Sequence, residues 1–399
     1  MIQSYWLRNV RPYGGEIEDI QIVEGRIGDR QPASGNPVAE PDLDGQGQLL
    51  VPSLVESHIH LDKTLWGQPW RPHSAGPTLK ARIANERQIL RELKSPIAER
   101  AGALLEQCIA RGSLLLRCHV DADPELGIEH VQAMLALRER YADLVDIEFV
   151  TFPQVGLVNR PGVEALMREA LELGVEVVGG LDPCGIDNDP IAHLSILFEL
   201  ADRFDRGIDI HLHDGGELGL WQIARIIDFT ERYQRQGRVM ISHAFCLGMK
   251  NWAQVLPLAE RLAANRISLM TTAPSDIAIP PFTELLSAGV NVCLGSDGIR
   301  DAWTPMGNGD MLERAMLLAL RCGMRTDPEI CTAFEAAAGN GARALGRSDY
   351  GLATGQTANL LLLPAQTLSE AVVARPLART VISRGTVVAK NGSLLRSRL

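Results

Sequence analysis

The chain has 399 residues, of which 46% are hydrophobic, and its formal net charge is −10 at pH 7. Because an acidic chain without a basic run is repelled by anionic surfaces, we expect neither a nucleic-acid nor a membrane partner, and no apolar run reaches the roughly 18 residues of a membrane span. The seven cysteines are never spaced C-x-x-C, and the start, MIQSYWLRNV, lacks a signal-peptide pattern, which predicts a cytoplasmic protein with reduced thiols.

Short β-type pieces separated by turn signals make up residues 1–50, among them SYWLRNV, DIQIVEGRI and GQLLV. TANLLLL, ARTVISRG and TVVAKNG have the same character near the other end of the chain. We therefore expect residues 1–50 and 347–399 to join in one small β-sandwich domain. Residues 51–346 are expected to form the second, larger domain.

Eight short apolar runs alternate with helical stretches through the middle of the chain. They read LLVPSLVESH, GSLLLRCHVD, VDIEFVTF, VEVVGGLD, GIDIHLH, RVMISHA, RISLMTT and NVCLGSD. Buried parallel strands that alternate with helices predict a (β/α)₈ TIM barrel. An open doubly wound sheet is disfavoured, because no glycine-rich phosphate loop follows the first run. A longer helical stretch at about 75–110 is expected to cover the mouth of the barrel.

Six of the nine histidines lie at the ends of predicted strands, which is where a barrel of this kind gathers its chemistry. Asp297 ends the eighth strand. Imidazoles and a carboxylate that converge in a buried place are costly unless a divalent cation satisfies them together, so the pattern predicts a metal site. The six histidines are His58, His60, His119, His211, His213 and His243.

Five motifs in chain order resemble the metal-dependent amidohydrolase superfamily, and within it the cytosine deaminase-like branch. They are SLVESHIHLDKT, FPQVGL, DIHLH, ISHAF and GSDGIRDAW, and the resemblance runs from about residue 48 to 365. It implies one divalent metal ion per chain, zinc or iron. Relatives with two metals bridge them through a modified lysine on the fourth strand, where VEVVGGLDP has none. The metal ligands implied by the resemblance are His58, His60, His211 and Asp297, with His243 binding the ion or holding the nucleophilic water.

The resemblance leaves the proton shuttle open between two neighbours. Cytosine deaminases usually carry a glutamate at the position of Asp214, and it moves a proton to the ring and to the leaving amine. Asp214 is one methylene shorter, so either it acts from a shifted position or His213 takes over the role. A third interpretation is that His213 only orients its neighbours through a hydrogen bond. Glu217 ranks last, because it lies in a turn past the strand.

Four further residues are candidates for the catalytic site and for contact with the substrate. Lys63 would supply a positive charge near a developing oxyanion or a ring carbonyl, unless it is a solvated surface lysine. Gln154 offers a donor and an acceptor to an amidine–carbonyl edge, and Trp303 offers a flat surface for stacking. The alternatives to substrate contact are that Gln154 is an ordinary loop residue and that Trp303 only fills the core. Asp182 is expected to meet a polar substrate edge or Lys63.

The sequence thus predicts a mononuclear aminohydrolase, or deaminase, that breaks an exocyclic C–N bond of an aminated N-heterocycle with metal-activated hydroxide. The expected partner is a small heterocycle, a cytosine-like pyrimidine or a triazine, and a homo-oligomer stays open. Gly298 stands where cytosine deaminases commonly have a second acid, which puts cytosine itself in doubt. A ring-opening cyclic amidase of the hydantoinase or dihydroorotase type is the alternative, disfavoured by the missing lysine. A non-catalytic binder is disfavoured because every ligand is present.

Overall fold

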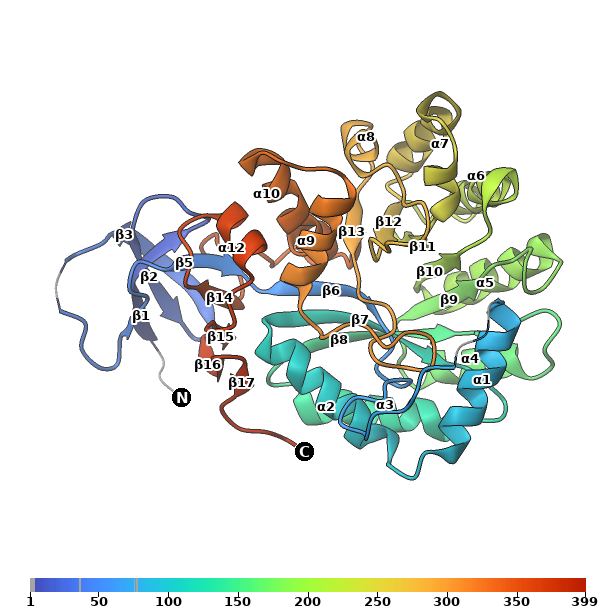
Figure 1. The fold of residues 1–399 in the computed structure, drawn as a ribbon, viewed down its shortest axis with the longest axis horizontal. Helices are drawn as coiled ribbons and strands as arrows, with labels where there is room; N and C mark the ends of the chain where they lie inside the picture. Colours follow the sequence, from blue (N-terminus) through green and yellow to red (C-terminus); the bar gives the residue numbers. More distant parts are fainter. Residues whose placement is uncertain (1–3, 36, 75, 77) are drawn as a thin grey trace.

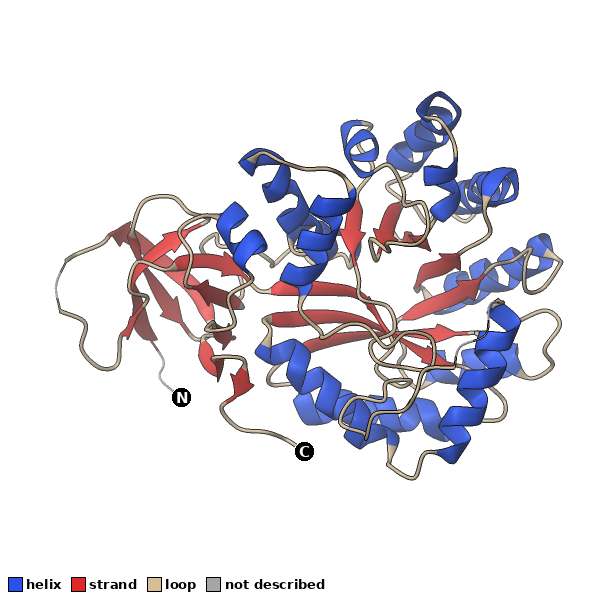
Figure 2. Ribbon diagram, in the orientation of Figure 1, coloured by secondary structure: helices blue, strands red, loops and turns tan. Residues whose placement is uncertain are grey.

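The computed structural model describes residues 4–399 apart from 36, 75 and 77. Residues 1–3 and 36 of the predicted N-terminal β segment, and residues 75 and 77 of the predicted helical stretch, therefore lie outside the described residues. The larger part of the molecule is a barrel of parallel strands with helices packed around it (Figures 1 and 2). A smaller β-sheet unit lies beside the barrel.

The barrel holds eight strands within the described part of the chain, and their order in space is their order in sequence. They are β6 (Leu54–Ile59), β7 (Ser113–Asp121), β8 (Asp146–Phe152), β9 (Val177–Leu181), β10 (Gly207–Leu212), β11 (Val239–His243), β12 (Ser268–Thr271) and β13 (Val292–Leu294). The first and last strands meet where the backbone N–H of Asp297 donates to the carbonyl of His58 at 2.8 Å. This contact closes the barrel directly beside two predicted metal ligands.

Seven of the eight barrel strands fall inside the predicted apolar runs, and β6 extends one residue past the first run, so the predicted fold class is confirmed. The first run is divided between two sheets. Its first half is β5 (Leu49–Pro52), which pairs in the smaller unit, and its second half is β6 of the barrel. Both halves are fully buried. A buried apolar run has the same sequence pattern whether its strand belongs to the barrel or to the smaller sheet.

Strands from both ends of the chain form the smaller unit. The sheet order is β17-β16-β15-β14-β5-β1-β2-β3, with β4 beside β1. The additional strands are β1 (Ser4–Pro12), β2 (Glu18–Val23), β3 (Arg26–Pro32), β4 (Leu43–Asp44), β14 (Leu360–Leu363), β15 (Thr380–Ser383), β16 (Thr386–Lys390) and β17 (Ser393–Leu394). The antiparallel pairing of β14 with β5 joins the two ends of the chain, and Leu7, Leu50 and Leu360 lie in the apolar cluster that it buries. The domain boundaries at residues 50 and 347 stay a prediction.

The helices surround the barrel (Figure 2). They are α1 (Leu79–Glu92), α2 (Ile97–Ala110), α3 (Ile128–Tyr141), α4 (Val163–Glu172), α5 (Pro190–Phe204), α6 (Gly216–Arg232), α7 (Trp252–Ala264), α8 (Phe282–Ser287), α9 (Met311–Arg321), α10 (Asp327–Ala336), α11 (Gly339–Ala344) and α12 (Leu368–Ala374), with the 3₁₀ turn η1 (Phe245–Met249). Among the described residues, no helix combines the length and the apolar character that a membrane crossing requires.

The predicted helical stretch at about 75–110 is divided into α1 and α2. Half of the side chains of α2 are buried, and this helix packs against β7 and α3. The polar helix α1 instead reaches the loops that follow the barrel strands, since Asn85 donates to the carbonyl of Ala302 at 3.4 Å. It therefore lies over the end of the barrel where the strands terminate.

Candidate metal centre and active site

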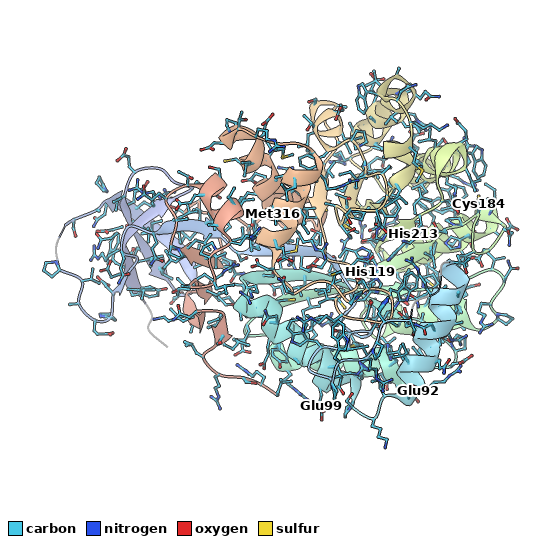
Figure 3. All side chains as sticks on the ribbon, in the orientation of Figure 1. Glu92, Glu99, His119, Cys184, His213 and Met316 are labelled. Atoms are coloured by element: carbon cyan, nitrogen blue, oxygen red, sulfur yellow. The ribbon has the colours of Figure 1, made fainter. Side chains whose placement is uncertain are left out.

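The predicted site residues lie at the carboxyl ends of the barrel strands. Figure 3 labels His119 and His213, which come from β7 and from the end of β10, both in the middle of the barrel. At three of the strand ends, a residue other than glycine has a left-handed φ: Asp182 (33°), His243 (73°) and Asp297 (61°). Such a conformation costs free energy and persists where the surrounding structure fixes it, which is common in functional sites.

Three imidazoles and one carboxylate converge on one point. The ligand atoms of His58, His60, His211 and Asp297 all lie within 4.8 Å of one another. His60 Nε2 is 3.2 Å from Asp297 Oδ1 and 3.4 Å from His211 Nε2, and His58 Nε2 is 3.6 Å from Asp297 Oδ1. Ligands that surround a tetrahedral ion at about 2.0–2.1 Å stand about 3.3 Å apart, so these separations fit a single cation.

The protonation states of this cluster also fit a cation. Burial lowers the pKa of His60 to about 4 and holds the pKa of His211 well below its usual value, so both imidazoles are neutral and able to bind a metal. Desolvation opposes ionisation of Asp297, but the neighbouring imidazoles of His58 and His60 keep the pKa of this carboxyl well below its usual range. His58 Nε2 is buried without a hydrogen-bond partner among the described residues. Nitrogen and carboxylate donors of this kind suit zinc or iron.

A buried chain of polar groups fixes the tautomer of His58. The hydroxyl of Ser242 donates to Asp209 Oδ1 at 2.7 Å and therefore accepts from His58 Nδ1 at 3.0 Å. Nδ1 then carries the proton, and Nε2 is left free as a ligand atom. Arg117 donates to the other oxygen of Asp209 at 3.2 Å and balances its charge.

A second group of possible ligands, formed by His58, His119 and Asp209, lies below the first. His119 Nε2 is 3.7 Å from Asp209 Oδ2. Arg117 already provides the positive charge at Asp209, which makes this group a poor place for a cation. His119 is outside the four-residue cluster but packs against it, with its ring centroid 4.0 Å from that of His58 and 4.7 Å from that of His211.

Asp182 holds His213 by two hydrogen bonds. Nδ1 of His213 donates to Asp182 Oδ2 at 2.8 Å, and the backbone N–H of His213 donates to Oδ1 at 2.6 Å. Desolvation disfavours the charged imidazolium, but the ion pair with Asp182 outweighs it and raises the pKa of His213. Nε2 of His213 has no hydrogen bond to another described residue and can exchange a proton. The ring stacks on His243 at 4.4 Å, and Nε2 of His243 is 3.9 Å from Asp297 Oδ2.

Asp214 points to a different set of partners. Its Oδ2 accepts from the backbone N–H of Gly185 and from Nε2 of Gln222, both at 2.9 Å. These contacts tie the carboxylate to the loop after β9 and to α6. Glu217 is exposed and pairs with Lys250 on the rim. Of the three candidates for proton transfer, His213 is the one that contacts the residues around the metal ligands.

Lys63 and Gln154 form a second, buried polar cluster. Lys63 Nζ pairs with Asp121 Oδ1 at 2.9 Å and donates to the amide oxygen of Gln154. It also lies 5.0 Å above the ring of Phe152. Lys63 is therefore not a surface lysine, and Gln154 is not a free loop residue. The amide nitrogen of Gln154 donates to Glu86 of α1, a residue that the sequence analysis did not select.

The sequence pattern described as "Amidohydrolase family" matches residues 43–389. The chain belongs to this family. The N-isopropylammelide isopropyl amidohydrolase of Pseudomonas sp. (strain ADP) is 30% identical over 392 residues, which cover 94% of each chain. YahJ of Escherichia coli K12 is 37% identical over 307 residues, 76% of this chain and slightly less than two thirds (66%) of that protein.

Two solved structures agree with this assignment. N-isopropylammelide isopropylaminohydrolase from Burkholderia multivorans is 40% identical and superposes with a TM-score of 0.94 over 99% of this chain and 100% of that one. The 5-methylcytosine deaminase from Klebsiella pneumoniae is 28% identical, with a TM-score of 0.85 over 97% and 98% of the two chains. The expected resemblance to the cytosine deaminase-like branch is confirmed. As a member of this metal-dependent family, the protein is a hydrolase that acts on carbon–nitrogen bonds.

The structure of this amidohydrolase differs from the sequence interpretation at Asp182. Of the two contacts expected for Asp182, the one with Lys63 is absent from its described contacts, and Asp182 holds His213 instead. The contact with a polar substrate edge stays a prediction. Lys63 pairs with Asp121 because β6 and β7 are neighbouring strands, whereas Asp182 follows β9 farther around the barrel. The carboxylate of Asp182 thus orients His213, one of the two main candidates for the proton shuttle.

Trp303 lies in a tight loop after β13. Asp301 Oδ1 accepts from the backbone N–H groups of Trp303 and Thr304, both at 2.8 Å, and this shapes the loop. The indole is half-buried, and its contact with a substrate ring stays a prediction. A Cβ atom on Gly298 would lie 1.9 Å from Asp301 Oδ2, so a side chain at this position would displace the carboxylate that shapes the loop.

Three residues that contact the predicted site residues were not predicted from the sequence: Asp209, Ser242 and Glu86. Asp209 and Ser242 lie inside the DIHLH and ISHA motifs, and the two-residue alternation of a strand places Asp209 on the same face as His211, so a signal was present. Glu86 gave none, because it is one acid among many in a polar helix. Only the fold brings it to Gln154.

Proposed function

We propose that this amidohydrolase hydrolyses an exocyclic C–N bond of an aminated pyrimidine or triazine ring, with one divalent ion, zinc or iron, held by four ligands. The ligands are His58, His60, His211 and Asp297. The observation that carries the proposal is the hydrogen-bonded pair of His213 and Asp182, which stacks on His243 at the edge of the ligand cluster. A metal site can activate water for attack on a carbon atom, and a positioned histidine can protonate the leaving nitrogen.

The residues of the chain divide this chemistry between them. When bound, a divalent ion acidifies water and so supplies a nucleophile at neutral pH. Asp297 and His243, 3.9 Å apart, accept a proton from the attacking water and orient it. His213 carries a proton on Nε2 to the leaving nitrogen, while Asp182 stabilises the imidazolium through Nδ1.

The opposite end of the site suits a flat, polar ring. Lys63 provides positive charge for a ring carbonyl, and Gln154 provides an acceptor for a ring N–H and a donor for an adjacent carbonyl. Trp303 is proposed to stack on the ring face. Two relatives, an N-isopropylammelide isopropylaminohydrolase and a 5-methylcytosine deaminase, support a substrate of this class. We further propose residues 51–346 as the catalytic domain and residues 1–50 with 347–399 as its β-sheet companion.

Metal analysis combined with a substrate screen tests this function. We expect one metal equivalent per chain and release of amine or ammonia from at least one of N-isopropylammelide, cytosine and 5-methylcytosine. His60→Ala should lose both metal and turnover, whereas His73→Ala, in an exposed loop, should keep both. Two tightly held metals, with turnover only of hydantoin or dihydroorotate, would replace the proposal with the ring-opening amidase. One metal without turnover of any ring would also refute it.

A further inference from the structure

Glu86 is a buried acid that the proposed chemistry does not use. It lies on α1, outside the barrel, and only 1% of its surface is exposed. Its Oε1 accepts from the amide nitrogen of Gln154 and lies 3.9 Å from Lys63 Nζ. Its Oε2 has no hydrogen-bond partner among the described residues. A carboxyl group is costly to bury, so this placement calls for a role.

The two neighbours of Gln154 determine which way its amide faces. The ammonium group of Lys63 can only donate, so the amide oxygen must face it. The NH₂ group then faces Glu86, which must accept. A rotation of the amide by 180° would place NH₂ against the ammonium group, where neither group can accept, and would remove the N–H that the Glu86 oxygen accepts. Gln154 is thus held from both sides, with one N–H and one lone pair left for a ligand.

Glu86 suits this task as a neutral group. Burial raises the pKa of Glu86 to about 8, against the opposing effect of Lys63, and the negative charges of Asp121 and Asp301 raise it further. At neutral pH its carbonyl oxygen can still accept from Gln154. The Lys63 charge stays balanced by Asp121, with which it makes the shorter contact of 2.9 Å.

We propose that Glu86 is a specificity-determining positioning residue: it fixes the amide of Gln154 so that the site recognises a ring edge of the form C(=O)–NH. This inference rests on the proposed function, since it assigns the ring-binding role to Gln154. It extends that function to a helix outside the barrel. Glu86 acts through Gln154 and needs no contact with the reacting atoms.

Equilibrium binding tests the proposal without turnover. The probes are cyanuric acid and uracil, two rings with C(=O)–NH edges, titrated calorimetrically into the metal-loaded protein. Glu86→Leu removes the acceptor, Glu86→Gln keeps one in a neutral side chain, and Glu92→Leu is the control on an exposed turn of the same helix. Without the acceptor, the ligand must order the amide of Gln154 on binding; at about 1–3 kcal/mol for this ordering, we expect Glu86→Leu to raise Kd roughly 5- to 150-fold. Glu86→Gln and Glu92→Leu should stay within about threefold of wild type.

A double-mutant cycle separates positioning from simple helix docking. In a Gln154→Leu background, Glu86→Leu should cause no further rise in Kd. With an active substrate, Glu86→Leu should raise KM and leave kcat within about fivefold. Unchanged Kd in Glu86→Leu, additive effects in the cycle, failure of Glu86→Gln to restore binding, or no binding of either probe to wild type would overturn the proposal. Normal probe binding without turnover of any amine would instead refute the proposed function alone.

Discussion

Nδ1 of His213 donates a hydrogen bond to Asp182 at 2.8 Å. The carboxylate of the neighbouring Asp214 accepts hydrogen bonds from Gly185 and Gln222. A group that transfers protons needs a free atom near the reacting centre and a pKa near the working pH. His213 meets both conditions, because its Nε2 is free and its pKa is raised from an ordinary value that is already close to neutral. Asp214 has the features of a residue that shapes a loop.

His213→Asn should lower kcat by roughly 10²–10⁴, the usual contribution of a positioned acid or base. The metal content should stay near that of wild type, because the four proposed ligands remain. Asp214→Asn is the matched comparison and should lose much less. The opposite ranking, with Asp214→Asn nearly inactive and His213→Asn active, would return the proton transfer to the carboxylate.

Ser242→Ala should weaken metal binding by about 10- to 100-fold, because it removes the acceptor that keeps the proton on His58 Nδ1. Competition with a chromogenic chelator measures this affinity. Ser113→Ala, at the start of β7 where the hydroxyl has no partner among the described residues, should have no effect. Equal metal affinities in the two variants would mean that the hydrogen bond from His58 to Ser242 is not required to keep Nε2 unprotonated for metal binding.

At the scale of elements, β9 differs from its neighbours because two glycines stand in its middle. A Cβ atom on Gly179 would lie 2.5 Å from the backbone oxygen of Thr151 on β8. One on Gly180 would lie 2.5 Å from Leu197 of α5. The strand is therefore packed too closely to carry side chains at these positions, and neither position has room for the bridging lysine of two-metal relatives.

Gly179→Ala should destabilise the protein by about 1–3 kcal/mol, because the added methyl group meets rigid backbone and not a flexible side chain. Gly207→Ala, at the start of β10, has its nearest atom at 3.3 Å and should cost clearly less. Urea unfolding followed by circular dichroism compares the two variants. Similar stabilities would show that β8 and β9 can separate without cost.

At the scale of the whole molecule, one buried ion pair ties the smaller sheet unit to the barrel. Arg379, just before β15, is fully buried and donates to both carboxylate oxygens of Asp310, at 3.1 and 2.9 Å. Asp310 also caps α9, which packs against β6 and β13 of the barrel. The two units are thereby joined by a bidentate contact as well as by apolar packing.

Acid should destabilise the metal-free protein through its buried histidines. The pKa of His60 is lowered to about 4 by burial, whereas an unfolded histidine titrates near 6.5. Between these values the unfolded state binds more protons, so the free energy of unfolding falls as the pH drops from about 6.5 to 4. His60 alone contributes roughly 3 kcal/mol to this loss.

Urea unfolding of chelated protein at pH 7 and pH 4 checks this expectation. His60→Gln should have the flatter pH dependence, and the loop variant His73→Gln should follow wild type. Parallel curves for wild type and His60→Gln would contradict it. Adding zinc or iron back at pH 7 should raise the melting temperature of wild type, because an ion that binds only the folded state stabilises it.

The sequence by itself determined the barrel and the branch of the family, because both rest on short-range patterns, whereas the metal-ligand set that it indicates stays a prediction. Eight apolar runs that alternate with helices predict the buried strands of a barrel. The carboxyl ends of these strands lie at one end of the barrel, so histidines that are far apart in the chain are expected to lie close together in space. An apolar run does not indicate which sheet its strand joins. The division of LLVPSLVESH between β5 and β6 therefore could not be predicted from the sequence.

Only the tertiary structure decided how the polar groups pair. Whether Asp182 meets Lys63 or His213, and whether Asp214 faces the metal ligands or Gln222, depends on distances of a few ångströms between strands and loops that no spacing in the sequence encodes. Glu86 is the clearest case. Its contact with Gln154 spans 68 positions and exists only because α1 lies over the end of the barrel.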